Sequence, residues 1–295
     1  MQTWSNNRLT HKRGGKMKVV RALKFLALVV LSVPTFVLAH GGEEPRVVME
    51  SDLEGPVHAG GVDLSFRMVD TEREKVIKPE DLDVVHEKKL HMFIFDEALV
   101  EFTHVHPEFD AEKNRWVVTA LLPKNGNYWV WAQGTLIVDE TTKVEFTTNM
   151  KLTTIGGQPA NSLPPQLPRT RSGSDGNSQV TLSTTRFVAG QMAMPTLTVT
   201  RNDGTSPEIT PFLGAKAHVI GVLSDGDTLI HAHPVEHDGG GGHHDGIHSH
   251  HDHGPNPNQF MIHVVFPEPG NYRLWVQYRD GGLLRTIPLA VKVTK

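Results

Sequence analysis

Apolar and polar residues alternate over short stretches of this chain, and few stretches show the spacing of an amphipathic helix. These stretches are rich in Val, Thr, Phe and Trp, and clusters of Gly, Pro, Asn and Asp separate them. The pattern is typical of an all-β sandwich or barrel. The predicted strands include Val62–Val69, Leu90–Phe95, Trp116–Leu122, Tyr128–Gln133, Leu197–Arg201 and Tyr272–Gln277.

The chain repeats itself. Its first part contains His91 and then the run Thr103-His104-Val105-His106-Pro107. The second part contains His218 and then the run Ile230-His231-Ala232-His233-Pro234, with the same spacing. Farther on, Pro123–Gln133 matches Pro267–Gln277. We therefore predict a tandem duplication of one β-sandwich domain of roughly 110 residues, which is an ordinary domain size.

The predicted domains are residues 40–155 and 179–295, joined by a linker over 156–178 that is rich in Pro, Gly and Ser and lacks periodicity. The second copy is longer than the first between its His-x-His-Pro motif and the matching Pro267 turn. That excess contains a tract of Gly and His over residues 237–253.

The first 39 residues have the pattern of a leader and signal peptide, with Met17 as an alternative true start. Basic residues from Lys16 to Lys24 precede the apolar run Phe25–Leu38, and a small-residue cleavage pattern ends at Ala39. The apolar run is shorter than the roughly 20 residues that span a bilayer. A periplasmic or secreted protein is therefore expected, with an uncleaved membrane anchor as the alternative.

Composition narrows the function. The chain has no cysteine, which excludes disulfides, thiolate zinc sites, blue-copper centres and a lipid anchor on cysteine. Removing the leader would take away seven of the 29 basic residues and none of the 33 acidic ones, so the net charge would be 22 − 33 = −11. Such an acidic surface disfavours binding to nucleic acid or anionic membranes and is compatible with attracting cations.

The repeated histidines are expected to share one face of a hairpin. A hairpin centred near residues 97–98 places His91 opposite His104, and His106 projects from the same face because it lies two residues farther on. In the second copy, a turn centred on Asp225-Gly226 places His218 opposite His233. A turn centred one residue earlier pairs His218 with His231 instead, and the shared face is unchanged.

Three imidazoles on one face suit Cu(I), Cu(II), Zn(II) or Ni(II). The sequence therefore predicts metal ligands in two triads, and their members are His91, His104 and His106, and His218, His231 and His233. The alternative is a structural role in which these histidines cap strand ends by hydrogen bonding to carbonyl groups beside Pro107 and Pro234.

Other side chains add to this prediction or stand outside it. His263 occupies the place of Thr119 in the first copy and is a possible further ligand in the second copy only. His58 and His86 have no counterpart and are expected to be ordinary surface residues. Met92 is expected in the core. Met192 and Met194 share one strand face, where we favour packing over a role as soft ligands for Cu(I).

The glycine-rich tract is expected to be a mobile loop that binds Zn, Ni or Cu with little selectivity, the alternative being a loop that only interacts with solvent. Its histidines are His237, His243, His244, His248, His250, His251 and His253. Cleavage after Ala39 would make His40 the N-terminal residue, which can chelate copper through its amine and its ring. The Gly41-Gly42 pair that follows argues against a rigid catalytic site there.

No hydrolase, phosphate-binding or zinc-protease motif is present, so an enzyme is not expected. Tyr128 and Tyr272 each follow Gly-Asn at a turn that enters a strand. This position resembles the tyrosine of Greek-key sandwiches, whose hydroxyl group hydrogen-bonds back to the preceding loop.

The pattern Leu-His, Phe-x-His-x-His-Pro and Pro-x-x-Gly-x-Tyr-x-x-Trp resembles exported bacterial domains of cupredoxin-like or immunoglobulin-like fold. It covers Leu90–Gln133 and Ala217–Gln277. Such domains often accompany copper and heavy-metal handling systems, and the resemblance implies a periplasmic metal-binding role for the two triads. The missing cysteine ligand argues against electron transfer.

These observations predict two tandem antiparallel β-sandwiches that bind copper or zinc for buffering, resistance or delivery. The partners implied are metal ions and an envelope metal transporter or metallochaperone, without nucleic acid or a lipid anchor. Two alternatives remain open. The first is a structural or interaction module of an envelope complex with incidental histidines, and the second is a copper oxidase that uses His40.

Overall fold

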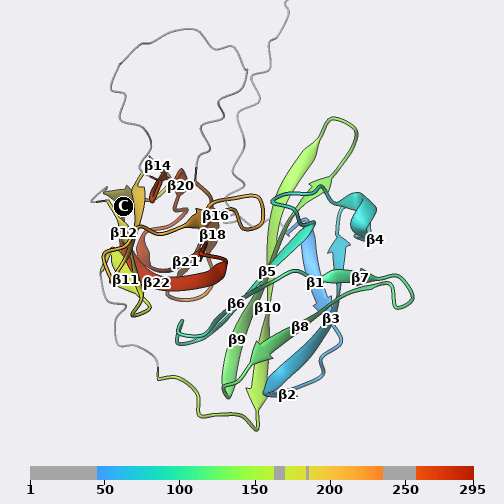
Figure 1. Cartoon of the computed structure of the whole chain (residues 1–295). Coiled ribbons are helices and arrows are strands. Elements are labelled where there is room, and N and C mark those ends of the chain that lie inside the picture. Colours follow the sequence, from blue (N-terminus) through green and yellow to red (C-terminus); the bar gives the residue numbers. More distant parts are fainter. Residues whose placement is uncertain (1–44, 163–169, 184–185, 235–256) are drawn as a thin grey trace, which may run out of the picture. The chain divides into compact units, whose positions relative to one another are not determined.

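The structure is a computed structural model that describes residues 45–162, 170–183, 186–234 and 257–295 (Figure 1). All of them belong to one compact unit, Ala39–Lys295. The predicted signal peptide, His40 and the histidine-rich tract lie outside the described residues. Among the residues described, no helix has the length and apolar character needed to cross a bilayer.

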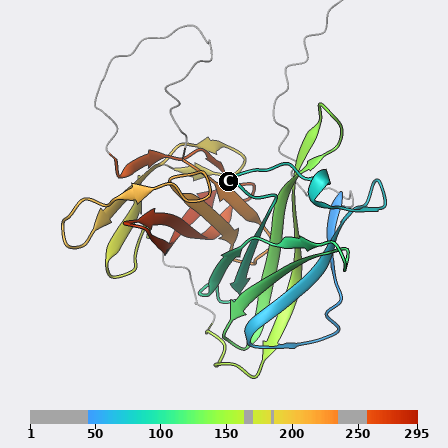
Figure 2. The same ribbon diagram turned by 45° about the vertical axis from the view of Figure 1, so that its right-hand side comes forward.

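The first domain consists of two sheets, and a single 3-10 turn, η1 (Pro79–Asp81), lies between β4 and β5. In the first sheet the order is β1 (Val47–Ser51), β3 (Gly60–Asp70), β8 (Arg115–Leu122) and β7 (Glu108–Asp110), with β4 (Lys75–Val76) paired to β3. In the second sheet the order is β2 (Val57–His58), β10 (Lys143–Ile155), β9 (Gly126–Ile137), β5 (Leu90–Asp96) and β6 (Phe102–Val105). Figure 2 shows the long strands β3 in blue and β10 in yellow-green in the two layers.

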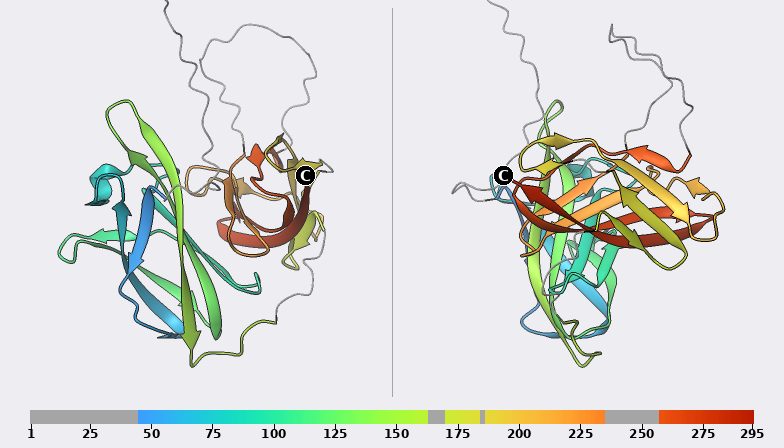
Figure 3. Two further views of the ribbon diagram at one scale, coloured as in Figure 1. Left: turned by 180° about the vertical axis from the view of Figure 1, so that it is seen from behind. Right: turned by 90° about the vertical axis from the view of Figure 1, so that its left-hand side faces the viewer.

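The second domain repeats this arrangement (Figure 3). One sheet has the order β11 (Ser172–Ser174), β12 (Ser178–Leu182), β15 (Thr196–Arg201) and β19 (Gln259–Met261). The other has the order β13 (Phe187–Val188), β22 (Leu283–Thr294), β21 (Gly270–Asp280), β17 (His218–Leu223) and β18 (Leu229–Ala232), with β16 (Ile209–Thr210) paired to β21. Strands β14 (Met192–Ala193) and β20 (Val264–Val265) form a separate pair.

The strand order confirms the predicted tandem sandwiches. The order β2-β10-β9-β5-β6 in the first domain corresponds to β13-β22-β21-β17-β18 in the second. In both sheets the first pair is parallel and the remaining pairs are antiparallel. Each of the six predicted strand runs lies within one of these strands.

Alternation along the strands builds the two cores. In β3, Val62, Leu64, Phe66 and Met68 are buried while the residues between them are half-buried or exposed. The predicted tyrosine contacts are present, since the hydroxyl groups of Tyr128 and Tyr272 donate to backbone oxygens four residues earlier at 3.3 and 3.0 Å. Met92 is buried in the first core, as expected.

Strand β11 lies inside the segment predicted to be linker. It pairs with β12, and the carbonyl of Arg171 accepts a hydrogen bond from the amide of Leu182 at 2.8 Å. The strand was not predicted because its residues, Ser-Gly-Ser, favour turns over strands. A Cβ atom on Gly173 would lie 2.0 Å from the oxygen of Pro288, so this close approach to β22 requires glycine.

A third apolar cluster joins the two domains. Strands β5 and β17 are buried along their whole length, so both of their faces are covered. The cluster comprises Phe93, Phe95, Leu99, Trp129 and Trp131 from the first domain and Ile220, Val222, Trp275 and Ala290 from the second. Trp131 Nε1 donates to the oxygen of Gly226 at 3.1 Å, and Arg273 Nε donates to the oxygen of Leu99 at 3.1 Å. The strand aromatics therefore build an interface as well as cores, which the sequence pattern did not predict.

Gly226→Ala tests this interface. A Cβ atom at this position would lie 2.3 Å from the Trp129 ring, and the residue has φ of 84°. Gly204→Ala is a matched control because Gly204 has φ of 80° and nothing within 4 Å of the added Cβ. We expect Gly226→Ala to lower the free energy of unfolding in urea by about 1–3 kcal/mol more than the control, because of overpacking. Equal losses would mean that the domains do not press together at Trp129.

Candidate metal centre

The first hairpin, β5–β6, differs from its predicted register. Phe93 pairs with His104 and Met92 pairs with Val105, so the next position places His106 opposite His91. The predicted pairing of His91 with His104 is therefore wrong, because the turn is centred one residue later. Leu99, with φ of 54°, makes that turn. Moving the centre by one residue changes the pairing by two, so the three histidines keep a common face.

The second hairpin, β17–β18, has the register predicted for a turn at Asp225-Gly226. Val219 pairs with Ala232 and Ile220 pairs with His231, which places His233 opposite His218. Both copies therefore share one register, in which the first histidine faces the third across the strands.

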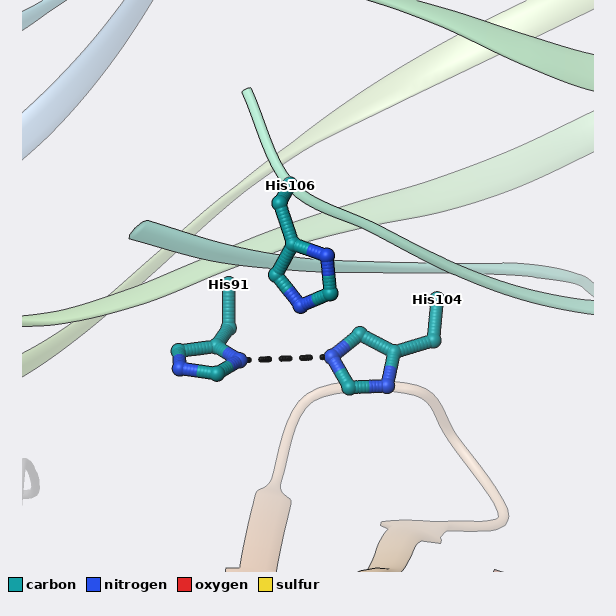
Figure 4. Close-up of side chains that lie close together, drawn as sticks. All are labelled: His91, His104 and His106. Carbon is teal, nitrogen blue, oxygen red and sulfur yellow. Dashed lines mark hydrogen bonds between the residues drawn. The ribbon is translucent and has the colours of Figure 1, made fainter. Parts of the chain in front are cut away.

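The first triad brings three ring nitrogens together (Figure 4). His91 Nδ1 lies 3.3 Å from His104 Nε2. The His106 ring centroid lies 5.0 Å from that of His91 and 4.7 Å from that of His104. His106 Nε2 is buried and makes no hydrogen bond. One nitrogen from each ring lies within 4.8 Å of the others, which is close enough for a common metal ion.

The second triad repeats this geometry. His218 Nδ1 lies 3.3 Å from His231 Nε2 and 2.8 Å from His233 Nε2. These are the same ring nitrogens, in the same order along the chain, as in the first triad. The ligand atoms again lie within 4.8 Å of one another.

The hydrogen bonds made by the ring nitrogens that point away from each triad determine which nitrogen of each ring carries the proton. His91 Nε2 lies 3.0 Å from the oxygen of Val85, and His104 Nδ1 lies 2.7 Å from Gln277 Oε1. Because oxygen can only accept in these contacts, the ring nitrogens are the donors. In the neutral rings, the converging nitrogens of His91 and His104 then carry lone pairs.

The same assignment holds in the second triad. His218 Nε2 donates to the oxygen of Phe212 at 2.7 Å, and His231 Nδ1 donates to Gln133 Oε1 at 2.8 Å. Both carbonyl acceptors lie six residues before the first histidine, at the start of equivalent turns that are closed by Val85–Lys88 and Phe212–Ala215 pairing. Sequence reasoning missed these acceptors because a backbone oxygen leaves no signature in residue type.

The two triads lie side by side. The ring centroids of His91 and His231 are 5.6 Å apart, and those of His104 and His218 are 6.0 Å apart. His86, which was expected to be an ordinary surface residue, stacks on His233 with centroids 3.6 Å apart. Comparison of the two copies could not identify His86, because it has no counterpart in the second copy and its contact with His233 joins the two domains.

Burial keeps the rings unprotonated. His91 and His218 have 3% and 0% of their surface exposed. Burial lowers the pKa of His104 to about 2, partly offset by its hydrogen bond to Gln277, and it lowers the pKa of His106 to about 3. Burial likewise lowers the pKa of His218 to about 4 and that of His233 to about 2. The pKa values of His91 and His231 are also lowered, again mainly by burial. Unprotonated imidazole is the form that binds metal.

The remaining predicted ligands are not in these clusters. His263 is exposed and is not among the residues whose ligand atoms converge. His58 is exposed, as expected. The tract histidines and His40 lie outside the described residues, so their predicted roles stay predictions. Met192 and Met194, for which packing was favoured over a role as soft ligands, are both more than half exposed.

Residues 47–151 and 172–295 match a family model described as a domain of unknown function, DUF8832. No curated protein matches the chain. The family description mentions neither copper nor cupredoxins, so the resemblance to copper-handling domains stays a prediction.

Several solved structures match at low similarity. A chimeric titin Z1Z2-Z1Z2 tandem is 12% identical, with 85% of this chain and 97% of that chain covered, at a TM-score of 0.18. An adhesin of Yersinia pseudotuberculosis is 9% identical, with 83% and 58% covered, at a TM-score of 0.20. A calcium-stabilised, ice-binding adhesin of an Antarctic bacterium is 9% identical, with 86% and 49% covered, at a TM-score of 0.22. No functional argument rests on these likenesses.

The lowered pKa values predict how the metal-free protein responds to pH. The histidines bind protons near pH 6.5 in the unfolded chain but not in the folded protein, because folding lowers their pKa values. Their effect on the free energy of unfolding is therefore absent above pH 6.5, and stability is lost as pH falls below that value. Each such histidine contributes about 1.4 kcal/mol per pH unit inside its window. We expect urea unfolding with chelator present to show stability falling from pH 7.5 to 5.5, above the range in which ordinary carboxylates titrate. The double variant His104→Gln, His231→Gln should show a shallower slope, and a flat profile for the unaltered chain would contradict the prediction.

Proposed function

The chain belongs to the DUF8832 family, and from the geometry of its histidine triads we propose that it binds two transition-metal ions, one at each triad. Copper and zinc are the ions we propose, because imidazole nitrogen suits both. The role is binding for buffering, resistance or delivery and not catalysis.

One observation carries this proposal, namely that buried lone pairs point at one another. In each triad the two inner nitrogens that lie 3.3 Å apart have no proton between them when the outer nitrogens donate to oxygen. Two facing lone pairs repel, and burial disfavours the protonation that would relieve the repulsion. A metal ion between them turns that repulsion into coordination.

The spacing also fits a metal ion. Bonds of about 2.0–2.1 Å from zinc to imidazole nitrogen, at tetrahedral angles, place neighbouring ligand nitrogens about 3.3–3.4 Å apart. The inner nitrogens of His91 and His104, and those of His218 and His231, are 3.3 Å apart. Three protein ligands leave a fourth position for water or for a ligand from a partner.

The signals at the start of the sequence support a place outside the cytoplasm, so we propose a periplasmic or secreted protein. A donor or acceptor protein such as an envelope transporter or metallochaperone would exchange the ion through the fourth position. The histidine-rich tract, which follows His233-Pro234 in the sequence, would act as a low-selectivity store.

Metal titration of the full chain tests the proposal. The histidines of the tract are first replaced by asparagine, so that only the folded sites compete for metal. We expect this chain to bind two Zn(II) or Cu(II) ions, measured by competition with a chromophoric chelator. Metal at a hundredfold excess over its dissociation constant should raise stability by about 2.7 kcal/mol per site.

Triad variants identify the sites. The pair His104→Asn, His106→Asn should remove one ion, and His231→Asn, His233→Asn should remove the other. His58→Asn is the matched control, because His58 is an exposed strand histidine outside both triads. A chain that loses all binding with the tract histidines would show that the triads are structural.

A further inference from the structure

We propose that each triad is completed by the other domain, because Gln277 and Gln133 position ligand histidines across the interface. Metal binding and docking of the two domains are then one equilibrium. This inference rests on the proposed function, within which it assigns the outer contacts of both metal sites and their dependence on each other.

Gln277 contacts the triad of the other domain. Its strand position on β21 is opposite His218, a member of its own domain's triad. Its Oε1 nevertheless accepts the proton of His104 Nδ1 at 2.7 Å. Its amide nitrogen donates to Thr286 Oγ1 at 3.0 Å, which determines the orientation of the amide. Only 4% of the residue is exposed.

Gln133 is its counterpart. It lies opposite His91 on β9, yet its Oε1 accepts the proton of His231 Nδ1 at 2.8 Å. The two glutamines close the matching Trp-x-Gln segments of the sequence repeat. The exchange is therefore reciprocal, with each domain supplying one acceptor to the other.

This acceptor has a defined effect on metal binding. A ligand histidine needs its outer N–H held by an acceptor, which fixes both the tautomer and the ring orientation, and loss of the acceptor typically costs 10–100-fold in metal affinity. The first histidine of each triad obtains its acceptor from its own domain, at Val85 or Phe212. The middle histidine obtains it only from the other domain.

Coupling between the two sites follows from this arrangement. An ion held by one triad favours the docked arrangement of the domains, since only that arrangement orients the middle histidine. The docked arrangement is also what the second triad needs. The first ion bound therefore raises the affinity for the second.

A single-site chain tests the inference. The tract histidines and His233 are replaced by asparagine, which leaves the first triad as the folded site, and Zn(II) affinity is measured by competition. We expect Gln277→Ala, in the second domain, to weaken binding by about 10–100-fold. Gln133→Ala, in the same domain as the site, should weaken binding much less, because it removes one contact between the domains but no acceptor of the first triad.

The two substitutions are matched in that they remove the same side chain from equivalent strands, although Gln277 also loses its hydrogen bond to Thr286. Gln277→Glu should retain the affinity, because a carboxylate oxygen also accepts the proton of His104. If both alanine variants weaken binding equally, or if neither does, the inference is overturned while the proposed function survives. If the single-site chain binds no Zn(II) before either glutamine is changed, the proposed function fails first.

A different face of the second domain carries an independent proposal. We infer a surface site for a soft monovalent metal ion such as Cu(I) or Ag(I), centred on Met194 and His263. Met192 and Met261 lie on either side of this pair, about 13 Å apart along the strands, so either one can supply a third donor to an ion held there, but not both at once.

Strand register brings these side chains together. Met192 pairs with Val265 and Thr196 pairs with Met261, so one continuous register places Met194 opposite His263. The amide of Ile262 donates to the oxygen of Pro195 at 3.0 Å, which supports this register across the break between the two strand pairs. Directly opposite positions on one face have Cβ atoms about 4.5–5.5 Å apart.

Exposure distinguishes this face from core packing. Met192, Met194 and Met261 are 53%, 55% and 45% exposed, although methionine is among the most often buried residue types. Their neighbours Ala193, Phe260 and Ile262 are buried, so the alternation is intact and the sulfur-bearing face points outward. Thioether sulfur with one imidazole is a donor set that selects Cu(I) over zinc.

Site-resolved NMR on the full chain tests this second proposal. With the methionine methyl groups carbon-13 labelled, Ag(I) serves as a redox-silent probe, and single Met→Leu variants assign the signals. We expect Ag(I) to shift the signals of Met192, Met194 and Met261 and to leave that of half-buried Met150 in place, while Zn(II) shifts none of the three. If the three signals do not move with Ag(I), or if they move together with that of Met150, the site does not exist.

Discussion

The packing of six imidazole rings between two sandwiches, two of them buried and four half-buried, with their inner nitrogens converging, is the constraint on which the arrangement depends. An uncharged ring is the form that tolerates burial, and its outer N–H must then find an acceptor. Each domain offers one backbone carbonyl for this purpose, and the other domain offers one glutamine oxygen. Docking, proton placement and ligand orientation therefore follow from a single set of contacts.

The aromatic cluster makes that docking possible. Strands β5 and β17 present apolar side chains on both faces, so one face joins a sandwich core and the other joins the partner domain. The histidines extend the interface side of the same strands, where Phe93 lies 4.9 Å from the His231 ring. A metal ion placed there would be shielded from bulk water on the side of the interface, which strengthens its interaction with the ring nitrogens.

The sequence allowed the fold class, the duplication, the tyrosine contacts and the shared face of each triad to be predicted, because all of these follow from period-two alternation and repeated motifs. The predicted pairing of His91 with His104 was wrong, because nothing in Asp96–Glu101 marks Leu99 as the left-handed turn residue. The domain interface was not predicted, for another reason. Trp129 and Trp131 have the pattern of strand aromatics whether they pack in a core or in an interface. A glutamine within a strand likewise gives no sign that its oxygen accepts a hydrogen bond from a histidine of the other domain.

The reciprocal glutamines have the form of an isologous contact, in which the same patch is used twice about a twofold axis. A single copy of this domain supplies the three histidines of one triad and one of the two glutamines, and that glutamine contacts the middle histidine of the other copy. Such a copy would form a complete site only by meeting a second copy, at a rate and extent set by protein concentration. Joining the copies in one chain replaces that dependence with an effective concentration fixed by the linker. Completion of the two triads then no longer depends on how abundant the protein is.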